Sequence, residues 1–375
     1  MSKHSEAFVA FDTSKLRNAV AIADGGREGE VRFLGEIDNT PAATAKLVRK
    51  LATKYERITF CYEAGPTGYE LQRQIKSLGH ECLVVAPSLI PKKPGDRVKT
   101  NRRDAVGLVK LLRAGELTAV WVPDRRHEAM RDLTRARETA VIDLRSKRQQ
   151  VSAFLLRQGR WYPTTKKTWS KVHMEWLASQ KFEQPERSIV FEEMMFAIRQ
   201  AQERVERVEQ AIRAAVPDWS LAKVVPALMA LRGIDLISST GLLAELGDLS
   251  RFQTAPQVMG YLGMGCSEHS TGDTIKRGPI SKSGNRRARR ILVECAWSYR
   301  YPPRLGIVKQ QKVAAAPPKV REIAWKAQCR LNRRYRALIR RGKPKTVAIT
   351  AVARELAGFV WAVAGEAGRA EPAAK

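Results

Sequence analysis

The stretch of sequence that decides the fold is Ala7-Phe8-Val9-Ala10-Phe11-Asp12, a short apolar run that ends on a carboxylate. A run of this length predicts a buried strand whose last residue lies at the rim of a sheet. A single Asp in such a place is also typical of a turn or a helix cap. A second run with the same ending, Ile58-Thr59-Phe60-Cys61-Tyr62-Glu63, is followed by a glycine- and proline-rich turn at 64–68. Two carboxylates at strand ends of one sheet are candidates for a shared metal ion.

The composition indicates a polyanionic partner. The chain has 375 residues, enough for two or three domains, with a formal net charge of +29 and a pI near 10.3. Its five cysteines lack CxxC spacing, which favours reduced core residues over a zinc site or a disulfide framework. The apolar stretch from Val347 to Ala364 contains Arg354 and Glu355, which favours a packed helix over a membrane span. We therefore expect a cytoplasmic protein that binds nucleic acid and no membrane.

The elements expected around the two opening runs follow a known order. Apolar or alternating runs at 19–23 and 31–37 predict strands that form an antiparallel meander with the first strand. Thr40-Pro41 is typical of a helix start, and the segments after the second carboxylate predict a helix at 69–78, a strand at 82–86 and a helix at 103–114. This is the order of the ribonuclease-H/RuvC-like fold, in which the first and fourth strands are parallel neighbours. We assign residues 1–124 to this α/β domain.

A third carboxylate follows the last strand of this domain. In the expected fold Asp12 and Glu63 end adjacent strands, where ligands of open α/β sheets gather. Asn101 and Asp104 lie one helical turn apart at the start of the next helix, which brings Asp104 toward the other two carboxylates. Taken alone, Asp104 is also typical of a helix start that complements the helix dipole. Together the three carboxylates favour Mg²⁺, and two ions would stabilise the attacking and leaving oxygens of a phosphodiester.

Residues 125–216 predict a helical coiled-coil arm. Apolar residues recur there with steps of three, four and seven, in two series: Leu133, Ala140, Leu144, Val151, Phe154 and Leu155, then Met194, Ile198, Ala201, Val205, Val208, Ile212 and Ala215. Two antiparallel helices would give an arm roughly 40 Å long if the longer one runs from Ile189 to Ala215. Such an arm serves as a spacer, as an oligomerisation surface, or simply as intramolecular packing.

Residues 217–375 predict a mostly helical domain with phosphate-binding features. Leu228–Ile234 and Ser238–Leu243 indicate two short helices about a turn, similar to a helix-hairpin-helix element. The stretch 260–287 gathers small, hydroxyl-bearing and basic residues in a loop that enters a helix, a combination that suits phosphate. Ser270 in this loop is a phosphate contact or, if activated, a nucleophile. The basic candidates for nucleic-acid binding in this stretch are Lys276, Arg277, Lys282, Arg286 and Arg287.

A second basic group lies on a later helix and its exit. The apolar side of this helix comprises Ile323, Ala327, Leu331, Tyr335 and Leu338. The basic residues around it are too one-sided in sign for an ordinary solvated face, which predicts contact with a polyanion. Those that we assign to nucleic-acid binding are Arg330, Arg333, Arg334, Arg340 and Arg341.

Four motifs together resemble one family. FDTSK at 11–15, YEAGPTGY at 62–69, PGDRVKTNRRDA at 94–105, and SEHSTG with GPISKSGNRRARR at 267–290 occur in the order found in insertion-sequence transposases of family 110. The similarity covers essentially the whole chain. Members of this family join a RuvC-like DEDD domain to a C-terminal serine transposase domain, and are also described as bridge-RNA-guided recombinases. The resemblance implies a DNA recombinase that inserts and excises its own element, with a noncoding RNA that pairs with target and donor DNA.

Site residues follow from the resemblance motif by motif. The implied acidic positions are Asp12, Glu63, position 101 and Asp104, and the implied serine nucleophile is Ser270, with Thr271 as its nearest competitor. Position 101 is Asn101 in this chain, a poorer Mg²⁺ ligand, and Asp96 lies close enough in sequence to substitute for it. The family also implies a homo-oligomer, a dimer or tetramer, in which the carboxylates of one protomer face the serine of another.

Two other functions use the same residues. In a RuvC-like junction-resolving endonuclease Ser270 only binds phosphate, and no protein remains attached to DNA. In a non-catalytic nucleic-acid-binding protein Asn101 marks a silenced metal site, and replacing Asp12 changes nothing. A covalent protein–DNA adduct on a denaturing gel separates the recombinase from both.

Overall fold

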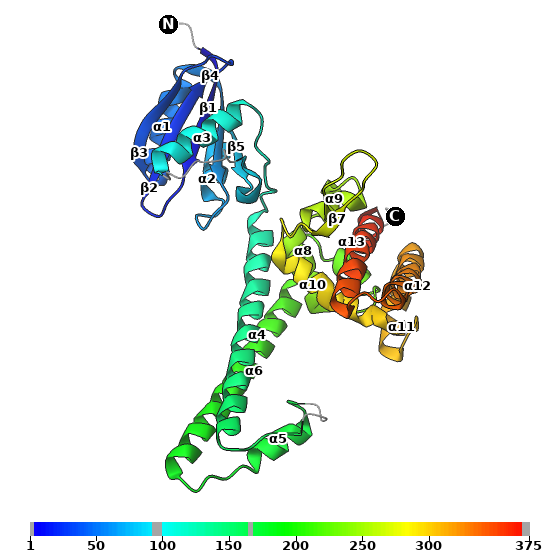
Figure 1. Ribbon diagram of the computed structural model, residues 1–375. Helices are drawn as coiled ribbons and strands as arrows, with labels where there is room; N and C mark the ends of the chain where they lie inside the picture. The colour runs from blue at the N-terminus through cyan, green and yellow to red at the C-terminus, as the bar shows by residue number, and fades with distance from the viewer. Residues whose placement is uncertain (1–3, 92–99, 164–167, 370–375) are drawn as a thin grey trace, which may run out of the picture. The chain divides into compact units, whose positions relative to one another are not determined.

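The protein consists of two compact units. The computed structural model describes residues 4–91, 100–163 and 168–369, and the chain divides into Met1–Val122 and Pro123–Lys375 (Figure 1). Each unit has buried apolar clusters of its own. The division falls close to the end of the predicted α/β domain at residue 124. A further boundary after residue 216 has no counterpart in this division, so the three-domain organisation stays a prediction.

The first unit is built on one five-stranded sheet with the order β3-β2-β1-β4-β5. β1 is antiparallel to β2 and β2 to β3, whereas β1 is parallel to β4 and β4 to β5. The predicted meander and the parallel pairing of the first and fourth strands are thus confirmed. The strands are β1 (His4–Asp12), β2 (Arg17–Asp24), β3 (Val31–Asp38), β4 (Tyr55–Glu63) and β5 (Glu81–Val85).

Helices cover both faces of this sheet (Figure 1). Successive side chains of a strand point to opposite faces. Accordingly Phe11 and Phe60 pack with α1 and α2 on one face, while Ala10 and Cys61 pack with α3 on the other. The helices of this unit are α1 (Pro41–Ala52), α2 (Glu70–Ser77), the 3₁₀ turn η1 (Pro87–Leu89) and α3 (Asn101–Arg113).

Local signals set the ends of these helices. The Thr40 hydroxyl accepts a hydrogen bond from the Ala43 N–H at the start of α1, and Thr100 caps α3 in the same way. Gly79 follows α2 with a φ of +86°, a conformation that suits glycine and ends the helix. The helix start at Thr40-Pro41 and the stop at Gly79 were both predicted from the sequence.

Two long helices of the second unit form the arm. α4 (Arg125–Arg157) and α6 (Pro185–Ala215) run side by side in opposite directions (Figure 1). Near one end Arg137 lies 2.7 Å from Glu209, and near the other the rings of Phe154 and Phe191 stack. At 1.5 Å per residue the helices span about 45–50 Å, somewhat longer than expected because α6 begins four residues earlier.

The remaining helices pack around one large apolar core. The short helix α5 lies between the two arm helices in the chain, and the sequence did not indicate it. The elements are α5 (Lys171–Ala178), α7 (Val224–Leu228), α8 (Leu236–Leu246), η2 (Leu249–Arg251), α9 (Ala255–Tyr261), β6 (Cys266–Glu268), β7 (Arg277–Ile280), α10 (Arg286–Ala296), η3 (Trp297–Arg300), α11 (Ile307–Ala314), α12 (Pro318–Arg340) and α13 (Lys345–Arg369).

The two short helices predicted at 228–234 and 238–243 are shifted along the chain. α7 ends at Leu228, so the helix expected over the next six residues is wrong. Gly233 there has a φ of +80°, and an added Cβ would lie 2.4 Å from the carbonyl oxygen of Cys295. α8 starts earlier than expected because Asp235 and Ser238 form a reciprocal capping box.

The apolar C-terminal helix packs into the protein. Among the described residues one helix, Lys345–Gly368, is long and apolar enough to cross a membrane by length and composition alone, a test that core helices also pass. Half of its apolar window is buried, and Ile349, Val352 and Leu356 belong to the core of the second unit. This agrees with the packed helix predicted from Val347 to Ala364.

Candidate functional site

Two of the predicted acidic residues lie on one face of the sheet, at the end where β1 and β4 finish, which is called the acidic edge below. Asp12 and Glu63 are the last residues of the parallel neighbours β1 and β4. Two residues earlier in each strand, Ala10 and Cys61 pack on the side of α3. Because alternate residues share a face, Asp12 and Glu63 lie on the face that α3 covers.

The direction of α3 brings Asp104 to the same edge. At the start of α3 the Asn101 Nδ2 donates to Glu36 Oε1 at 3.4 Å, and Glu36 lies two strands from Asp12 in the same register. At its end Arg113 donates to a backbone carbonyl of the β2–β3 turn, at the opposite end of the sheet. α3 therefore begins at the carboxylate edge, and Asp104 lies in its first turn, partly buried.

These carboxylates have the donor chemistry of a divalent-metal site. Asp12, Glu63 and Asp104 supply hard oxygen ligands, which Mg²⁺ prefers. Within residues 4–91, 100–163 and 168–369, no three His, Cys, Asp or Glu side chains are spaced to hold one ion. Asp96, the predicted substitute ligand, lies outside the described residues. The donor types therefore fit a divalent cation, and the preorganised cluster expected from the sequence is not observed in the described part of the chain.

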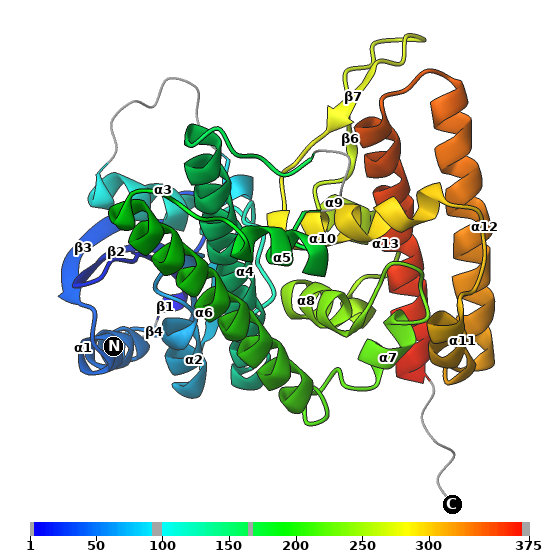
Figure 2. The same cartoon turned by 90° about the horizontal axis from the view of Figure 1, so that it is seen from below.

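The predicted serine loop is a β-hairpin. β6 and β7 are antiparallel, and the ladder continues as the His269 N–H donates to the Lys276 carbonyl at 2.9 Å and Thr271 bonds with Thr274. Gly272, with a φ of +56°, closes the turn at the tip. Figure 2 shows this hairpin projecting beyond α9 and α10. The sequence predicted an irregular loop because these strands have only three and four residues and lack the apolar alternation that marks a strand.

Close backbone packing fixes the base of the hairpin. A Cβ on Gly284 would lie 2.3 Å from the carbonyl oxygen of Tyr261, and one on Gly263 would lie 2.7 Å from that of Ser283. Both glycines have positive φ, +151° and +63°. Their approach lets the Lys282 N–H donate to the Gly263 carbonyl at 2.9 Å. The hairpin is thereby attached to the end of α9 and the start of α10.

Ser270 is exposed near the hairpin tip and contacts a carboxylate. Its Oγ donates to Glu268 Oε1 at 2.8 Å, and the Arg277 Nε donates to Glu268 Oε2 at 3.3 Å. Thr271, the next residue, forms an isolated antiparallel bridge with Thr274 at the tip. The sequence did not single out Glu268, although its position two residues before Ser270 was a signal that could have marked it.

The basic candidates near the hairpin fall into two groups. Lys276, Lys282 and Arg286 are exposed, and none of them forms an ion pair with another described residue. Arg277 is paired with Glu268, as above. Arg287 of α10 is partly buried and lies 2.9 Å from a carboxylate of the arm helix α4.

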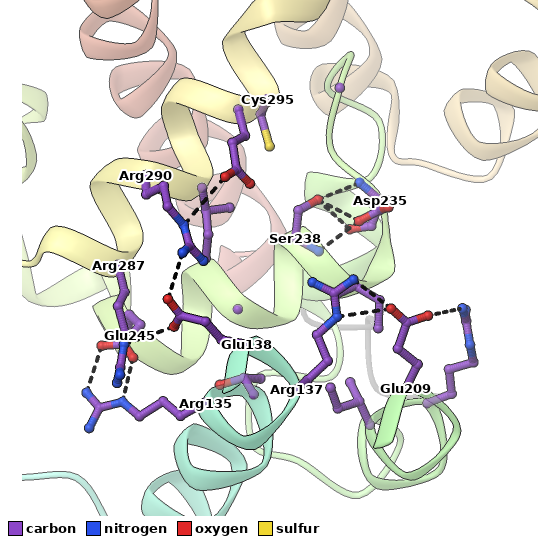
Figure 3. Close-up of a pocket in the computed structure, with 18 residues that line it drawn as sticks. Arg135, Arg137, Glu138, Glu209, Asp235, Ser238, Glu245, Arg287, Arg290 and Cys295 are labelled. Atoms are coloured by element: carbon purple, nitrogen blue, oxygen red, sulfur yellow. Dashed lines mark hydrogen bonds and ion pairs between the residues drawn. The ribbon is translucent and has the colours of Figure 1, made fainter. Parts of the chain in front are cut away.

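A charged pocket of about 370 Å³ lies where the arm meets α8 and α10 (Figure 3). Glu138 of α4 accepts from both Arg287 and Arg290 of α10, at 2.9 and 2.8 Å. These ion pairs join the arm to the helix that follows the hairpin. The sequence missed Glu138 because its partners lie some 150 residues away in the chain and no local pattern marks them.

Glu245 is the most buried carboxylate of this pocket, with 4% of its side chain exposed. Arg135 donates to both of its oxygens, at 2.8 and 3.0 Å, and the Asn285 amide donates at 2.8 Å. Burial raises the pKa of Glu245, but the hydrogen bonds from Arg135 and Asn285 outweigh it and hold the pKa below its usual value. Because Asn285 also caps α10, Glu245 holds the start of that helix in place.

The basic residues assigned to nucleic-acid binding on α12 and at its end are exposed, and ion pairing divides them into two groups. Arg330 and Arg334 lie 2.8 and 3.4 Å from Glu355 of α13. Arg333, Arg340 and Arg341 are exposed and form no ion pair with other described residues. A row of unneutralised guanidinium groups is the surface that a phosphate backbone contacts.

Comparisons with known proteins agree with these features. Residues 9–158 match a family model described as Transposase, that of the DEDD transposases of IS110, and residues 225–305 match one described as Transposase IS116/IS110/IS902 family. A protein described as transposase y4qE of Sinorhizobium fredii (strain NBRC 101917 / NGR234) is 56% identical over 98% of this chain and 90% of its own length. The transposase for insertion sequence element IS1533 of Leptospira borgpetersenii is 30% identical over 89% of this chain and 96% of its own length. The chain belongs to the IS110 family of transposases.

Membership of this family indicates the activity of the protein and the type of its N-terminal domain. This transposase is a DNA-modifying enzyme, and its DEDD domain, of ribonuclease-H-like fold, is matched over the sheet of the first unit and onward through helix α4. Domains of this type typically depend on a divalent metal. The junction-resolving endonuclease receives no support from these comparisons, and a protein without enzymatic activity is not what the family describes.

Proposed function

We propose that this transposase is an RNA-guided DNA recombinase of an insertion sequence, which cuts and rejoins donor and target DNA through a Mg²⁺-assisted phosphoserine intermediate. One observation carries the proposal: a chain of the IS110 family combines three carboxylates at one end of its sheet with an exposed serine on a hydrogen-bonded hairpin. Either feature alone has an ordinary explanation as a cap or a surface contact.

The acidic edge would hold the metal. Asp12, Glu63 and Asp104 are its ligands, and the Asn101 amide oxygen is a weaker fourth donor beside them. Bound Mg²⁺ neutralises charge on the phosphate and stabilises the leaving oxygen. The ends of β1 and β4 and the first turn of α3 already place these side chains at one edge. A cation would therefore order the side chains without a change in the backbone elements.

The hairpin would supply the nucleophile. Ser270 Oγ attacks a DNA phosphorus, the bond from phosphorus to one sugar oxygen breaks, and the chain retains the phosphate as a serine ester. Lys276, Lys282 and Arg286, which are exposed around the hairpin base and tip, hold the DNA backbone. The family resemblance implies that the site is completed between protomers of a dimer or tetramer, in which the carboxylates of one protomer face the serine of another.

A noncoding bridge RNA from the element would pair with donor and target DNA and select both. The net charge of +29 and the exposed basic face of α12 support a large nucleic-acid partner. On this proposal the chain binds the RNA largely through its backbone, and base pairing supplies the sequence specificity.

A denaturing gel tests the chemistry. The purified transposase, its copurifying RNA and labelled element ends should give a protein–DNA adduct that Ser270→Ala and Asp12→Ala both abolish. Retention of the adduct in Ser270→Ala, with its loss in Thr271→Val, assigns the nucleophile to Thr271. Cutting without any adduct contradicts the phosphoserine intermediate.

Sequencing of the copurifying RNA tests the guidance. One enriched species that maps beside the gene is the expected result. RNA that reflects only the abundance of cellular transcripts contradicts an RNA-guided mechanism, and leaves the family's DNA chemistry as it is.

A further inference from the structure

The hairpin β6–β7 gathers three polar groups on one face. Glu268, the last residue of β6, is paired across the strands with Arg277 of β7, and directly paired residues share a face of a hairpin. Ser270 lies two residues beyond the end of β6, and its 2.8 Å hydrogen bond to Glu268 brings its hydroxyl to the same side. The hydrogen bonds at His269 and at Thr271, closer to the tip, hold this part of the hairpin in register.

The contacts among the three groups are directed. The Ser270 hydroxyl donates its proton to Glu268 Oε1 at 2.8 Å, and Arg277 Nε holds the other oxygen, Oε2, at 3.3 Å. All three side chains are exposed, so a phosphate has access to Ser270 Oγ. The hydrogen bond from Ser270, and next the one from Arg277, lower the pKa of Glu268, which keeps the carboxylate ionised at neutral pH as an acceptor.

We propose that Glu268 is a catalytic residue that accepts the proton of Ser270 during attack on DNA, with Arg277 as the residue that positions its carboxylate. The inference rests on the proposed function, because it requires Ser270 to be the nucleophile. A serine hydroxyl is a weak nucleophile at neutral pH, and an adjacent base is the usual means of activating it.

The step balances as follows. The Oγ–P bond forms while the bond from phosphorus to the leaving sugar oxygen breaks, and the Oγ proton moves to Glu268 Oε1. The leaving oxygen takes a proton from water, and Glu268 returns its proton to solvent. A phosphate docked beside Glu268 raises the proton affinity of the carboxylate, which brings it closer to the value that a general base requires.

Arg277 has two effects on this arrangement. Its guanidinium fixes the carboxylate through Oε2, so that Oε1 remains directed at Ser270. It also reduces the repulsion between Glu268 and an approaching phosphate, since two anions close together are unfavourable. Loss of Arg277 should therefore slow adduct formation less than loss of the carboxylate.

Glu268→Gln is the sharpest test, because the amide oxygen still accepts a hydrogen bond from Ser270 but is a very poor base. We expect the single-turnover rate of adduct formation to fall by about 10²–10⁴-fold, and the limb of its pH profile that reports the protonation of Glu268 to disappear. DNA affinity should not fall, since the change removes a negative charge beside the phosphate, and the melting temperature should be unchanged, since the side chain is exposed at a hairpin. A wild-type rate in Glu268→Gln overturns the inference.

Ser270→Cys supplies a second test. A thiol with a pKa near 8.5 ionises without help, so Glu268→Gln should slow the Ser270→Cys variant at pH 9 far less than it slows the serine enzyme. An equal loss in both backgrounds means that Glu268 has only a structural role. An adduct that survives Ser270→Ala removes Ser270 as the nucleophile and with it the premise of this inference, and is thereby distinguished from a failure confined to Glu268.

Discussion

Gly284→Ala should damage the hairpin anchor through the backbone alone. Gly284 has a φ of +151°, a region that side-chain-bearing residues adopt at a cost of roughly 1–3 kcal/mol. The new Cβ would lie 2.3 Å from the carbonyl oxygen of Tyr261, and 2.9 Å from the backbone nitrogen of Gly263. Neither neighbour is a flexible side chain that moves aside, so overpacking adds roughly 1–3 kcal/mol.

The expected loss is therefore about 2–6 kcal/mol of the stability of the second unit. For a unit of this size about 1 kcal/mol lowers the melting temperature by roughly 2–4 °C, so we expect a decrease on the order of 10 °C. Thermal unfolding followed by circular dichroism measures it. Gly265→Ala is the matched control, because its φ is ordinary and an added Cβ would have no described atom within 4 Å.

The Gly284→Ala variant can also relieve the clash without a large loss of stability, if the base of the hairpin detaches from α9 and α10. In that case the Lys282 N–H loses its bond to the Gly263 carbonyl, and its hydrogen exchange accelerates while melting changes little. Adduct formation by Ser270 should fall in either case. A Gly284→Ala variant that matches Gly265→Ala in melting temperature and in the exchange of the Lys282 amide refutes the close approach on which this reasoning depends.

Three further changes test the other parts of the site. Asn101→Asp should tighten Mg²⁺ binding measured by calorimetry. Without the ion it should lower the melting temperature, since the new carboxylate faces Glu36 across the 3.4 Å contact. Unchanged Mg²⁺ binding contradicts a metal site at the acidic edge. Glu245→Gln should cost about 1–3 kcal/mol at pH 7 by urea unfolding. Because the folded pKa of Glu245 is lowered, its contribution is present above its ordinary pKa and lost as the pH falls through the folded value, so wild type should approach the variant in acid. Arg333→Gln should reduce the slope of the logarithm of nucleic-acid affinity against the logarithm of salt concentration by about 0.9. Arg330→Gln should change this slope little, because Arg330 is paired with Glu355.

The α/β unit was predictable because its signals are local. The apolar runs that end at Asp12 and Glu63, the cap at Thr40 and the stop at Gly79 each depend on a few neighbouring residues. The order of the elements then restricts the topology to few alternatives. The hydrogen-bonded register agrees with that order strand by strand.

The hairpin and the pocket were not predictable, for two different reasons. The strands that flank Ser270 are short, so no apolar alternation distinguishes them from a loop. Glu138 and Glu245 depend on arginines that are distant in sequence, Arg287 and Arg135, and only the packed chain brings them together. α7 was misplaced because Gly233 is held by contact with α10, which no local pattern records.

Only part of the excess positive charge is available to bind nucleic acid, because some of the arginines form ion pairs with acidic residues of the protein. Glu138 and Glu355 each neutralise two arginines, which thereby join helices of the second unit. An arginine engaged in this way must break an ion pair before it binds phosphate, whereas exposed residues such as Lys282 and Arg333 release only water and counterions. We therefore expect the cations that bind nucleic acid to be those that lack a described acidic partner, rather than those that are densest in the sequence. On the proposed mechanism Glu268 also depends on such a pair, since Arg277 holds its carboxylate beside the Ser270 hydroxyl.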